Sequence, residues 1–214
     1  MKIDSPGKLA LLICALTFIL SALAYPTLPE KIATHWNISG EPDQYSGRAF
    51  GAFLLPVMLF GLLALLEFLP KIDPANKGAG EEFSKAYGIV KLSLATFLSG
   101  LHVFVLFFPR IGNPDIRPVM AYLMFFLFMS IGLALPKTKR NYFLGIRTPW
   151  TLESEEVWER THAEGGRVFR LASAILFAGV FLPEIFFTSI FLILGASAYL
   201  VVFSYFAFKN IRKG

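Results

Sequence analysis

The chain has 214 residues, of which 55% are hydrophobic and only 16% are charged, and its formal net charge is +5. Soluble proteins usually carry about 25% charged residues, and the 23 phenylalanines represent more apolar surface than one soluble core would bury. This composition excludes an ordinary soluble domain and indicates a polytopic membrane protein whose surplus apolar surface faces lipid.

Six segments are apolar enough to be predicted as membrane-spanning helices, which need roughly 20 residues each. In chain order they are Leu9–Tyr25, Phe50–Leu69, Tyr87–Phe108, Val119–Leu135, Val168–Leu182 and Ile185–Phe208. The last two are separated at Pro183-Glu184, because the apolar run from 168 to 208 is too long for one helix. The predicted fold class is therefore an all-α, polytopic membrane helix bundle with six transmembrane helices.

The distribution of basic residues predicts the orientation of this bundle. In a six-span arrangement most lysines and arginines fall on the side of the N-terminus, and those on the opposite side are Lys31, Arg48, Arg110 and Arg117. The positive-inside rule then predicts a multi-pass cell-membrane protein with both termini in the cytoplasm. This bias and attraction to anionic membrane lipid account for the positive charge, so no direct nucleic-acid partner is expected.

An alternative interpretation stays open for the first span. Its apolar run ends at Ala22-Leu23-Ala24, which fits the small-residue cleavage site of a signal peptide. Cleavage there would leave five spans. With six spans, we divide the chain into an N-terminal helical hairpin, residues 1–85, whose outer loop carries His35, and a C-terminal four-helix region, residues 86–214, whose inner loop carries Gly145–Thr151.

Few polar residues lie within the spans. Glu67 is expected near the cytoplasmic interface, and Lys91 is expected to extend its side chain towards the same side. His102 lies deeper, and a hydrogen bond to a neighbouring helix is favoured over a proton relay, which would need several ionisable groups at one depth. The single cysteine, Cys14, excludes an internal disulfide and a multi-cysteine metal site.

The outer connection of residues 26–49 is long for a helical hairpin. Leu28, Ile32 and Trp36 are spaced four residues apart, which predicts a short helix with one apolar face and His35 beside it. Turns are expected at residues 37–40 and 40–43, where asparagine, glycine and proline gather.

Two roles are open for this outer loop. One is a compact cover on the membrane surface, anchored by interfacial aromatic residues. The other is a recognition surface, for which the candidate binding residues are His35, Trp36, Gly40 and Asp43. A histidine and a carboxylate are metal-binding residue types, but a structural metal site usually takes four ligands. We therefore predict no metal here.

The inner connection from Asn141 to His162 is the longest polar insertion in the chain. Helices of a bundle are usually joined by about 2–8 residues, so this insertion is predicted to contact a partner. The candidate binding residues are Asn141, Gly145, Arg147, Thr148, Pro149, Trp150, Thr151, Trp158 and His162. The basic run before it, residues 137–140, suits the phosphates of membrane lipid.

Local rules predict the shape of this insertion. Gly145 permits a sharp turn. Ser154 is a predicted N-cap for a helix that carries Trp158 and His162 one turn apart and runs towards the fifth span, with a break at Gly165-Gly166.

The insertion contains no nucleophile elbow, phosphate-binding loop or zincin helix. Glu155, Glu159 and His162 lie along a related helical face, but the two glutamates are equally explained as a solvated surface. We therefore predict a protein that is not an enzyme, with no catalytic residue, no metal and no cofactor.

Together the two loops resemble the SdpI family of bacterial immunity proteins, including the domain of unknown function at that family's N-terminus. The matching outer-loop residues are Leu28-Pro29, Ile32, His35, Gly40, Pro42 and Asp43. The matching inner-loop residues are Asn141, Gly145-Ile146-Arg147-Thr148-Pro149-Trp150-Thr151, Trp158, Thr161-His162 and Gly166. The chain departs from the family at Ala33, where proline is frequent, and this departure concerns the local shape of the outer loop.

The resemblance implies a six-span membrane protein without catalysis, which protects its cell from a secreted toxic peptide. It further implies signal transduction by capture of a cytoplasmic repressor. Our hypothesis is that the outer loop senses the peptide and the inner loop captures the repressor. Two alternatives stay open. A small transporter or efflux component would use His102 and Glu67, and a lipid-acting membrane enzyme would use His35 or His162 as a base without an evident nucleophile.

Overall fold

The computed structural model describes residues 5–74 and 80–212, and this part of the chain is mostly helical. The helices are α1 Ser5–Ala24, α2 Arg48–Ile72, α3 Glu81–Phe107, α4 Ile116–Ala134, α5 Pro149–Glu153, α6 Glu155–Ala178 and α7 Phe186–Ile211. Two strands, β1 Lys31–Trp36 and β2 Pro42–Gly47, form a hairpin between α1 and α2. The predicted all-α membrane helix bundle is confirmed.

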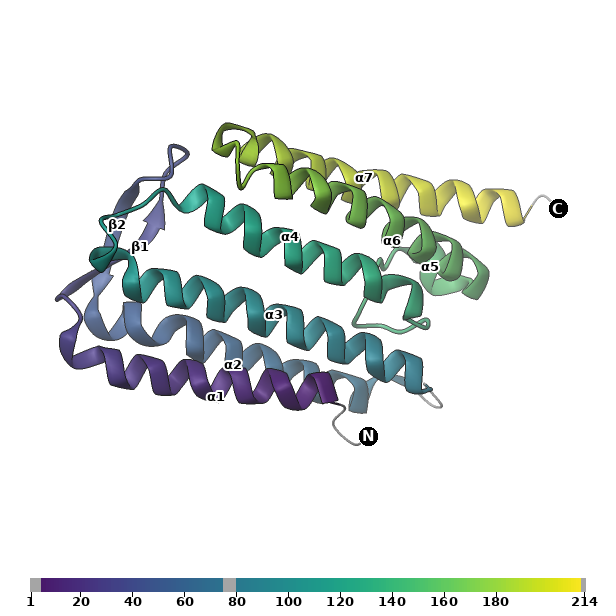
Figure 1. The fold of residues 1–214 in the computed structure, drawn as a ribbon. Helices are drawn as coiled ribbons and strands as arrows, with labels where there is room; N and C mark the ends of the chain where they lie inside the picture. The colour runs from purple at the N-terminus through teal and green to yellow at the C-terminus, as the bar shows by residue number, and fades with distance from the viewer. Residues whose placement is uncertain (1–4, 75–79, 213–214) are drawn as a thin grey trace.

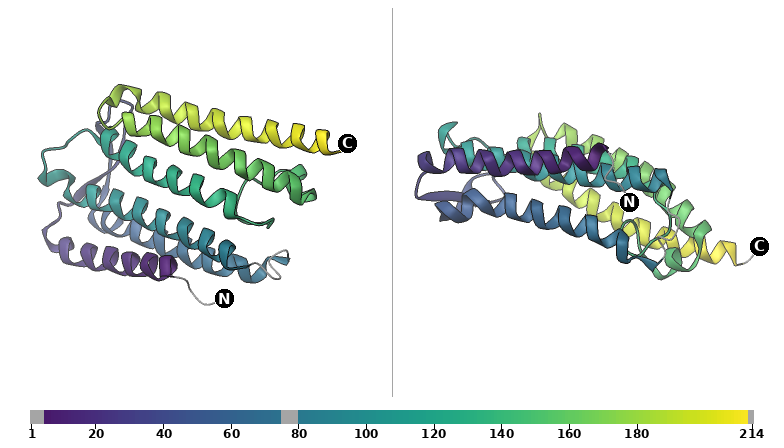
Figure 2. Two further views of the ribbon diagram at one scale, coloured as in Figure 1. Left: turned by 45° about the vertical axis from the view of Figure 1, so that its right-hand side comes forward. Right: turned by 90° about the horizontal axis from the view of Figure 1, so that it is seen from below.

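The long helices lie side by side and define two ends of the molecule (Figure 1). The β1–β2 hairpin lies at one end, which we call the hairpin end. Helix α5 and the start of α6 lie at the other, which we call the motif end, and α1 begins and α7 ends on that side (Figure 2). The two long loops of the sequence are therefore at opposite ends of one bundle.

Packing runs across the bundle in one continuous series. Helix α3 packs against α1, α2 and α4, and α6 packs between α4 and α7. Large apolar side chains such as Leu16, Phe60 and Phe191 remain more than half exposed on α1, α2 and α7, as expected for surfaces solvated by lipid. The division of the chain at residues 85 and 86 stays a prediction.

Five helical segments of the described chain are long and apolar enough to cross a membrane: Ser5–Thr27, Arg48–Ile72, Glu81–Arg110, Ile116–Lys137 and Pro183–Ile211. The expected span Val168–Leu182 is not among them, so a count of six is not confirmed. Residues 168–178 of this expected span form the second half of α6, and the first half of that helix, which begins at Glu155, is polar.

The predicted break at Gly165-Gly166 is wrong, because α6 passes through both glycines without interruption. A side chain at Gly166 would come within 2.8 Å of the Gly132 carbonyl oxygen and within 2.6 Å of Pro136. The glycine is therefore explained by the close approach of α6 to α4, not by a turn.

The predicted short helix at Leu28–Trp36 is also wrong. Residues 31–36 form β1, which pairs antiparallel with β2 in a register that joins Ile32 to Ser46 and Trp36 to Pro42. Alternation of Ile32, Thr34 and Trp36 fits a strand, and branched side chains favour it. The turn at residues 37–40 is confirmed, whereas a second turn at 40–43 is wrong because β2 begins at Pro42.

The polar residues of the helices pair across the bundle. Lys91 of α3 donates to the Glu67 carboxylate of α2 over 2.7 Å. His102 of α3 is fully buried, and its Nε2 lies 2.7 Å from the Ser21 hydroxyl of α1. The expected hydrogen bond between His102 and a neighbouring helix is confirmed.

Candidate functional site

The inner insertion folds around His162, whose side chain is 1% exposed. The ring Nδ1 lies 2.8 Å from the Trp158 carbonyl oxygen, which only accepts, and the ring Nε2 lies 2.9 Å from the Ile146 amide, which only donates. Nδ1 must then carry the proton and Nε2 must be bare. Burial accordingly lowers the pKa of His162 to about 4, so this imidazole is a neutral structural link, not a free base.

Trp158 lies directly against this histidine. Its indole stacks on the imidazole with ring centroids 3.9 Å apart, and its Nε1 donates to the Thr138 carbonyl oxygen over 3.0 Å. Both aromatic side chains are buried, which follows from their four-residue spacing on the inward face of α6. Trp158 thus joins α6 to the chain that leaves α4.

Gly145 is required by the same pair. Its φ of +121° lies in a region that side chains rarely adopt, and a Cβ there would collide with the His162 ring and approach Trp158 within 3.2 Å. The predicted sharp turn at Gly145 therefore has a packing cause as well as a conformational one.

Thr148 and Thr151 close the next turn. Thr148 caps α5, with its side chain accepting from the Thr151 amide, and the Thr151 hydroxyl in turn accepts from the Thr148 amide. The Thr148 hydroxyl also lies 3.0 Å from that of Ser204, on α7. All three side chains are buried, so this turn fixes the insertion to the last helix.

Asn141 organises the start of the insertion. Its side-chain amide donates to the carbonyl oxygens of Lys139 and Leu144, and its carbonyl oxygen accepts from the amides of Phe143 and Leu144. The side chain is 1% exposed, and its hydrogen-bonding capacity is used within the loop.

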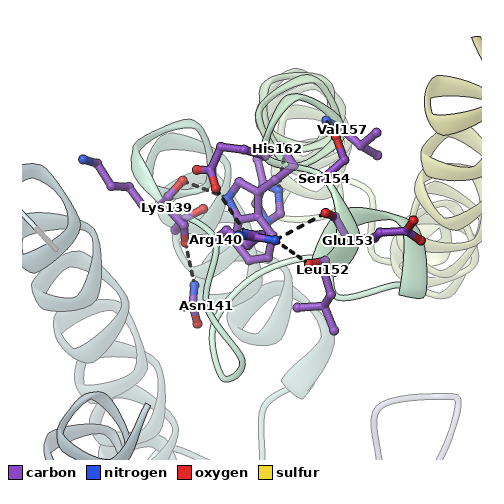
Figure 3. A network of polar contacts seen from close by, with 11 residues as sticks. Lys139, Arg140, Asn141, Leu152, Glu153, Ser154, Val157 and His162 are labelled. Atoms are coloured by element: carbon purple, nitrogen blue, oxygen red, sulfur yellow. Dashed lines mark hydrogen bonds and ion pairs between the residues drawn. The ribbon is translucent and has the colours of Figure 1, made fainter. Parts of the chain in front are cut away.

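Arg140 fastens the insertion from outside, as Figure 3 shows. Its guanidinium donates to the carbonyl oxygens of Leu152 and Glu153 and pairs with Glu155 at 3.2 Å. Arg140, one member of the basic run at 137–140, therefore binds groups of the protein itself. The predicted N-cap at Ser154 is confirmed.

Three candidate residues of the insertion keep an accessible side chain. Arg147 and Pro149 are exposed and Trp150 is half-buried, with its ring 5.1 Å from that of Tyr205 on α7. Arg147 donates one bond, to the Tyr142 carbonyl oxygen over 2.6 Å. The insertion thus consists of a buried scaffold that presents a small cationic and aromatic surface.

At the hairpin end the arrangement is reversed, because the candidate side chains are mainly outside. His35 and Asp43 are exposed partners across the hairpin, 2.5 Å apart. Trp36 packs edge-on against Phe108 and tilted against Phe104, so it anchors the hairpin on α3.

Gly40, at the tip of the hairpin, has a φ of +82°. A Cβ there would collide with the carboxylate of Asp115, which caps α4 by accepting from the Arg117 amide. Gly40 therefore allows the hairpin to rest on the start of α4.

The structure brings the inner candidates together but separates them from His35, Trp36, Gly40 and Asp43 by the length of the bundle (Figure 1). Glu155 and Glu159 do not face His162, since both are exposed while the imidazole is buried. Among the described residues, no group of three or more histidine, cysteine, aspartate or glutamate side chains lies close enough to hold a metal ion.

Sequence reasoning missed several residues that hold the insertion. Thr138, Ser204 and Asp73 contact it from η4 (Leu135–Lys137), α7 and the end of α2. None has a local signal, because each acts through a contact distant in sequence.

Comparison with known proteins supports the family resemblance in both regions. Residues 12–60 match a domain of unknown function, DUF1648, and residues 137–207 match the SdpI/YfhL protein family. The chain is 25% identical over 189 residues to the immunity protein SdpI of Bacillus subtilis (strain 168), which covers 87% of this chain and 84% of that protein. No solved structure matches the chain.

The resemblance inferred from the two loops is thereby confirmed. The first match spans α1, the hairpin and the start of α2, and the second spans the insertion, α5, α6 and most of α7. The matched regions thus include both surfaces described above.

Proposed function

We propose that this chain is a membrane immunity protein that protects its cell from a secreted toxic peptide and transmits the presence of that peptide to a cytoplasmic repressor. The observation that carries the proposal is the likeness to the immunity protein SdpI over 87% of the chain. The hairpin and the inner insertion, one within each matched region, also lie at opposite ends of the bundle, as a protein with one partner on each side of a membrane requires.

The hairpin end is the proposed contact with the peptide. It offers the exposed His35–Asp43 pair beside two accessible apolar side chains, Ile38 and Tyr45, which are 69% and 53% exposed. A polar pair next to apolar surface suits an amphipathic peptide that approaches along the membrane interface.

The motif end is the proposed contact with the repressor. Arg147, Pro149 and Trp150 lie outside the buried scaffold, and arginine and tryptophan are enriched in interfaces. A pocket of about 300 Å³ adjoins Arg147, between the loop and α7, with Ser197 and Val201 in its wall.

A protection assay tests the proposal. The chain and its variants are expressed in bacteria that lack the immunity protein SdpI and are exposed to the peptide from which it protects. Arg147→Ala and Trp150→Ala are expected to abolish protection or repressor capture at normal membrane abundance. The control is Arg160→Ala, which replaces an exposed arginine of α6 that pairs with Glu156. Full protection by both test variants would refute the role of this surface.

The outer surface is tested in the same assay. His35→Ala and Asp43→Asn are expected to reduce protection, because the first removes one partner of the exposed pair and the second removes the negative charge of the other. Glu184→Gln, in the α6–α7 connection, is a charge-removing control at the same end of the bundle. Unchanged protection in both hairpin variants would show that the peptide does not contact the His35–Asp43 pair.

The proposed orientation has its own test. In a variant with Cys14 replaced, His35→Cys and Trp150→Cys are labelled separately with a membrane-impermeant thiol reagent in whole cells. With both termini cytoplasmic, only position 35 reacts before the cells are opened. Labelling of position 150 in intact cells would reverse the orientation.

The repressor arm is tested by location. A tagged candidate repressor is expected to move from the cytoplasm to the membrane when peptide is added, and to stay in the cytoplasm with Arg147→Ala. If recruitment to the membrane does not depend on the peptide or on Arg147, the proposed repressor capture is refuted and only the immunity role remains.

A further inference from the structure

Asp73 reaches the inner insertion from another part of the chain. It directly follows α2, is 6% exposed, and its Oδ2 accepts a hydrogen bond from the Tyr142 amide over 3.0 Å. The residue lies outside both regions that match known families, residues 12–60 and 137–207.

The bond completes a turn that Asn141 builds only in part. The Asn141 side chain accepts from the amides of Phe143 and Leu144. The acceptor for the Tyr142 amide is the Asp73 carboxylate. The Tyr142–Asp73 bond is partly buried, and an amide shielded from water is costly to leave without an acceptor, so the turn relies on Asp73 for its last partner.

The carbonyl group of the same residue leads to the exposed surface. The Tyr142 carbonyl oxygen accepts from the Arg147 guanidinium over 2.6 Å, whereas the Tyr142 side chain is 50% exposed. Residue 142 is therefore held by its backbone, with Asp73 on one side and Arg147 on the other.

Helix α2 connects this point with the hairpin. It starts at Arg48, directly after β2, and continues without interruption to Ile72. Its first turns also pack closely on β1, since a Cβ at Gly51 would come within 2.7 Å of the Ile32 side chain. A helix of this length spans about 37 Å, so one continuous helix, which contains Pro56 and Pro70, touches both ends of the bundle.

We propose that Asp73 is a positioning residue that couples the hairpin to the inner loop: a shift of the hairpin moves α2, and the Asp73–Tyr142 hydrogen bond passes that shift to the residue that Arg147 holds. This coupling rests on the proposed function for its biological meaning. It names the route by which peptide at one end alters the surface offered at the other.

Hydrogen exchange of the purified protein in lipid nanodiscs tests the local part. In Asp73→Ala, the peptide covering residues 141–148 is expected to exchange at least about tenfold faster, because the Tyr142 amide loses its acceptor. Asp73→Asn keeps an acceptor oxygen, so its exchange rate at 141–148 is expected to lie between those of the original protein and Asp73→Ala. Glu82→Gln, an exposed carboxylate at the start of α3, is the matched control.

The outcomes separate a local effect from a folding failure. Faster exchange confined to 141–148 supports the proposal. Exchange as slow as in the original protein in Asp73→Ala overturns it. If Asp73→Ala also speeds exchange in the core of α6 and α7, the test rests on Asp73→Asn. Unchanged exchange at 141–148 in Asp73→Asn, with α6 and α7 intact, also overturns the role of Asp73.

The coupling itself is tested from the far end. Gly51→Ala forces α2 or the hairpin to shift, and Gly61→Ala, on the same helix with open space around it, is the control. Gly51→Ala is expected to change exchange at 141–148 when Asp73 is present and to have no added effect in Asp73→Ala. An equal effect in both backgrounds overturns the coupling.

This experiment uses no toxic peptide, so its failure differs from failure of the proposed function. If the unaltered chain gives no protection while the exchange cycle behaves as expected, immunity is refuted and the coupling stands. If protection is normal and Asp73→Ala protects as well as the original with unchanged exchange, immunity stands and the coupling is refuted.

Discussion

The indole of Trp158 lies almost parallel to the imidazole of His162, with an angle of 17° between the ring planes. Both side chains are buried, and their polar atoms bond to backbone groups of Thr138, Ile146 and Trp158 itself. An arrangement in which each ring nitrogen already has a partner leaves no free base. The pair is therefore a structural centre of the insertion, and His162 is not available as the base that the enzyme alternative requires.

The first prediction concerns pH. Burial lowers the pKa of His162 to about 4, whereas the unfolded value is about 6.5. Between these values the unfolded chain binds the proton and the folded chain does not, so stability is full above pH 6.5 and falls as the pH drops towards 4. The total loss amounts to about 3 kcal/mol.

Thermal unfolding in detergent micelles between pH 4 and 7.5 measures this loss. His162→Gln has a lower but flatter profile, because it lacks the titrating group, and the difference between the two profiles isolates His162 from the carboxylates. Parallel profiles for the two proteins would contradict the prediction.

Gly145→Ala is predicted to be destabilising. The added methyl group collides with the His162 ring, and the residue keeps a backbone conformation that costs an alanine about 1–3 kcal/mol. Gly195→Ala, in open space on α7, is the control and should be neutral or slightly stabilising. Comparison of unfolding midpoints tests this, and equal midpoints for the two variants would count against it.

Trp158→Phe separates stacking from hydrogen bonding. Phenylalanine keeps a ring against His162 but leaves the Thr138 carbonyl oxygen without its indole donor, which should cost about 1–3 kcal/mol. Trp158→Ala should cost about 3–5 kcal/mol, because it also opens a cavity. Denaturant unfolding of both variants checks the order, and an equal loss in both would show that the hydrogen bond carries the effect.

Local sequence patterns predicted the structure correctly where residues close together in the chain determine it. Ser154 caps α6 as predicted, and the four-residue spacing of Trp158 and His162 places both on one face of that helix. The spans predicted at α1, α2, α3, α4 and α7 follow from hydropathy alone, since lipid acts on each helix separately. These features need no knowledge of contacts between distant segments.

Two kinds of feature were not predictable. Ile32 and Trp36 fit a helical spacing of four and a strand alternation of two at once, and so short a run does not distinguish them. The contacts of Asp73 with Tyr142 and of Ser204 with Thr148 join residues far apart in the chain. Only the packing of the bundle creates them, so most of the scaffold beneath Arg147 had no signal in the sequence.

Gly40→Ala is predicted to loosen the hairpin end. The substitution strains a residue with a φ of +82° and drives a methyl group into the Asp115 carboxylate, which caps α4. We expect a loss of more than about 1 kcal/mol and faster hydrogen exchange at the start of α4. Gly47→Ala, where a Cβ meets nothing within 4 Å, is the control, and an equal effect of both substitutions would contradict the stated cause.

The last prediction weighs the transporter alternative. The Ser21 hydroxyl donates to the Thr17 carbonyl oxygen, so its oxygen accepts from His102 Nε2. Ser21→Ala should cost about 0.6–1.7 kcal/mol, the range for hydrogen bonds between membrane helices, and should leave protection unchanged. Ser189→Ala, which loses a bond within its own helix, is the control. A proton flux in proteoliposomes that disappears in His102→Ala would instead favour transport, because a histidine that only fastens α1 to α3 moves no protons.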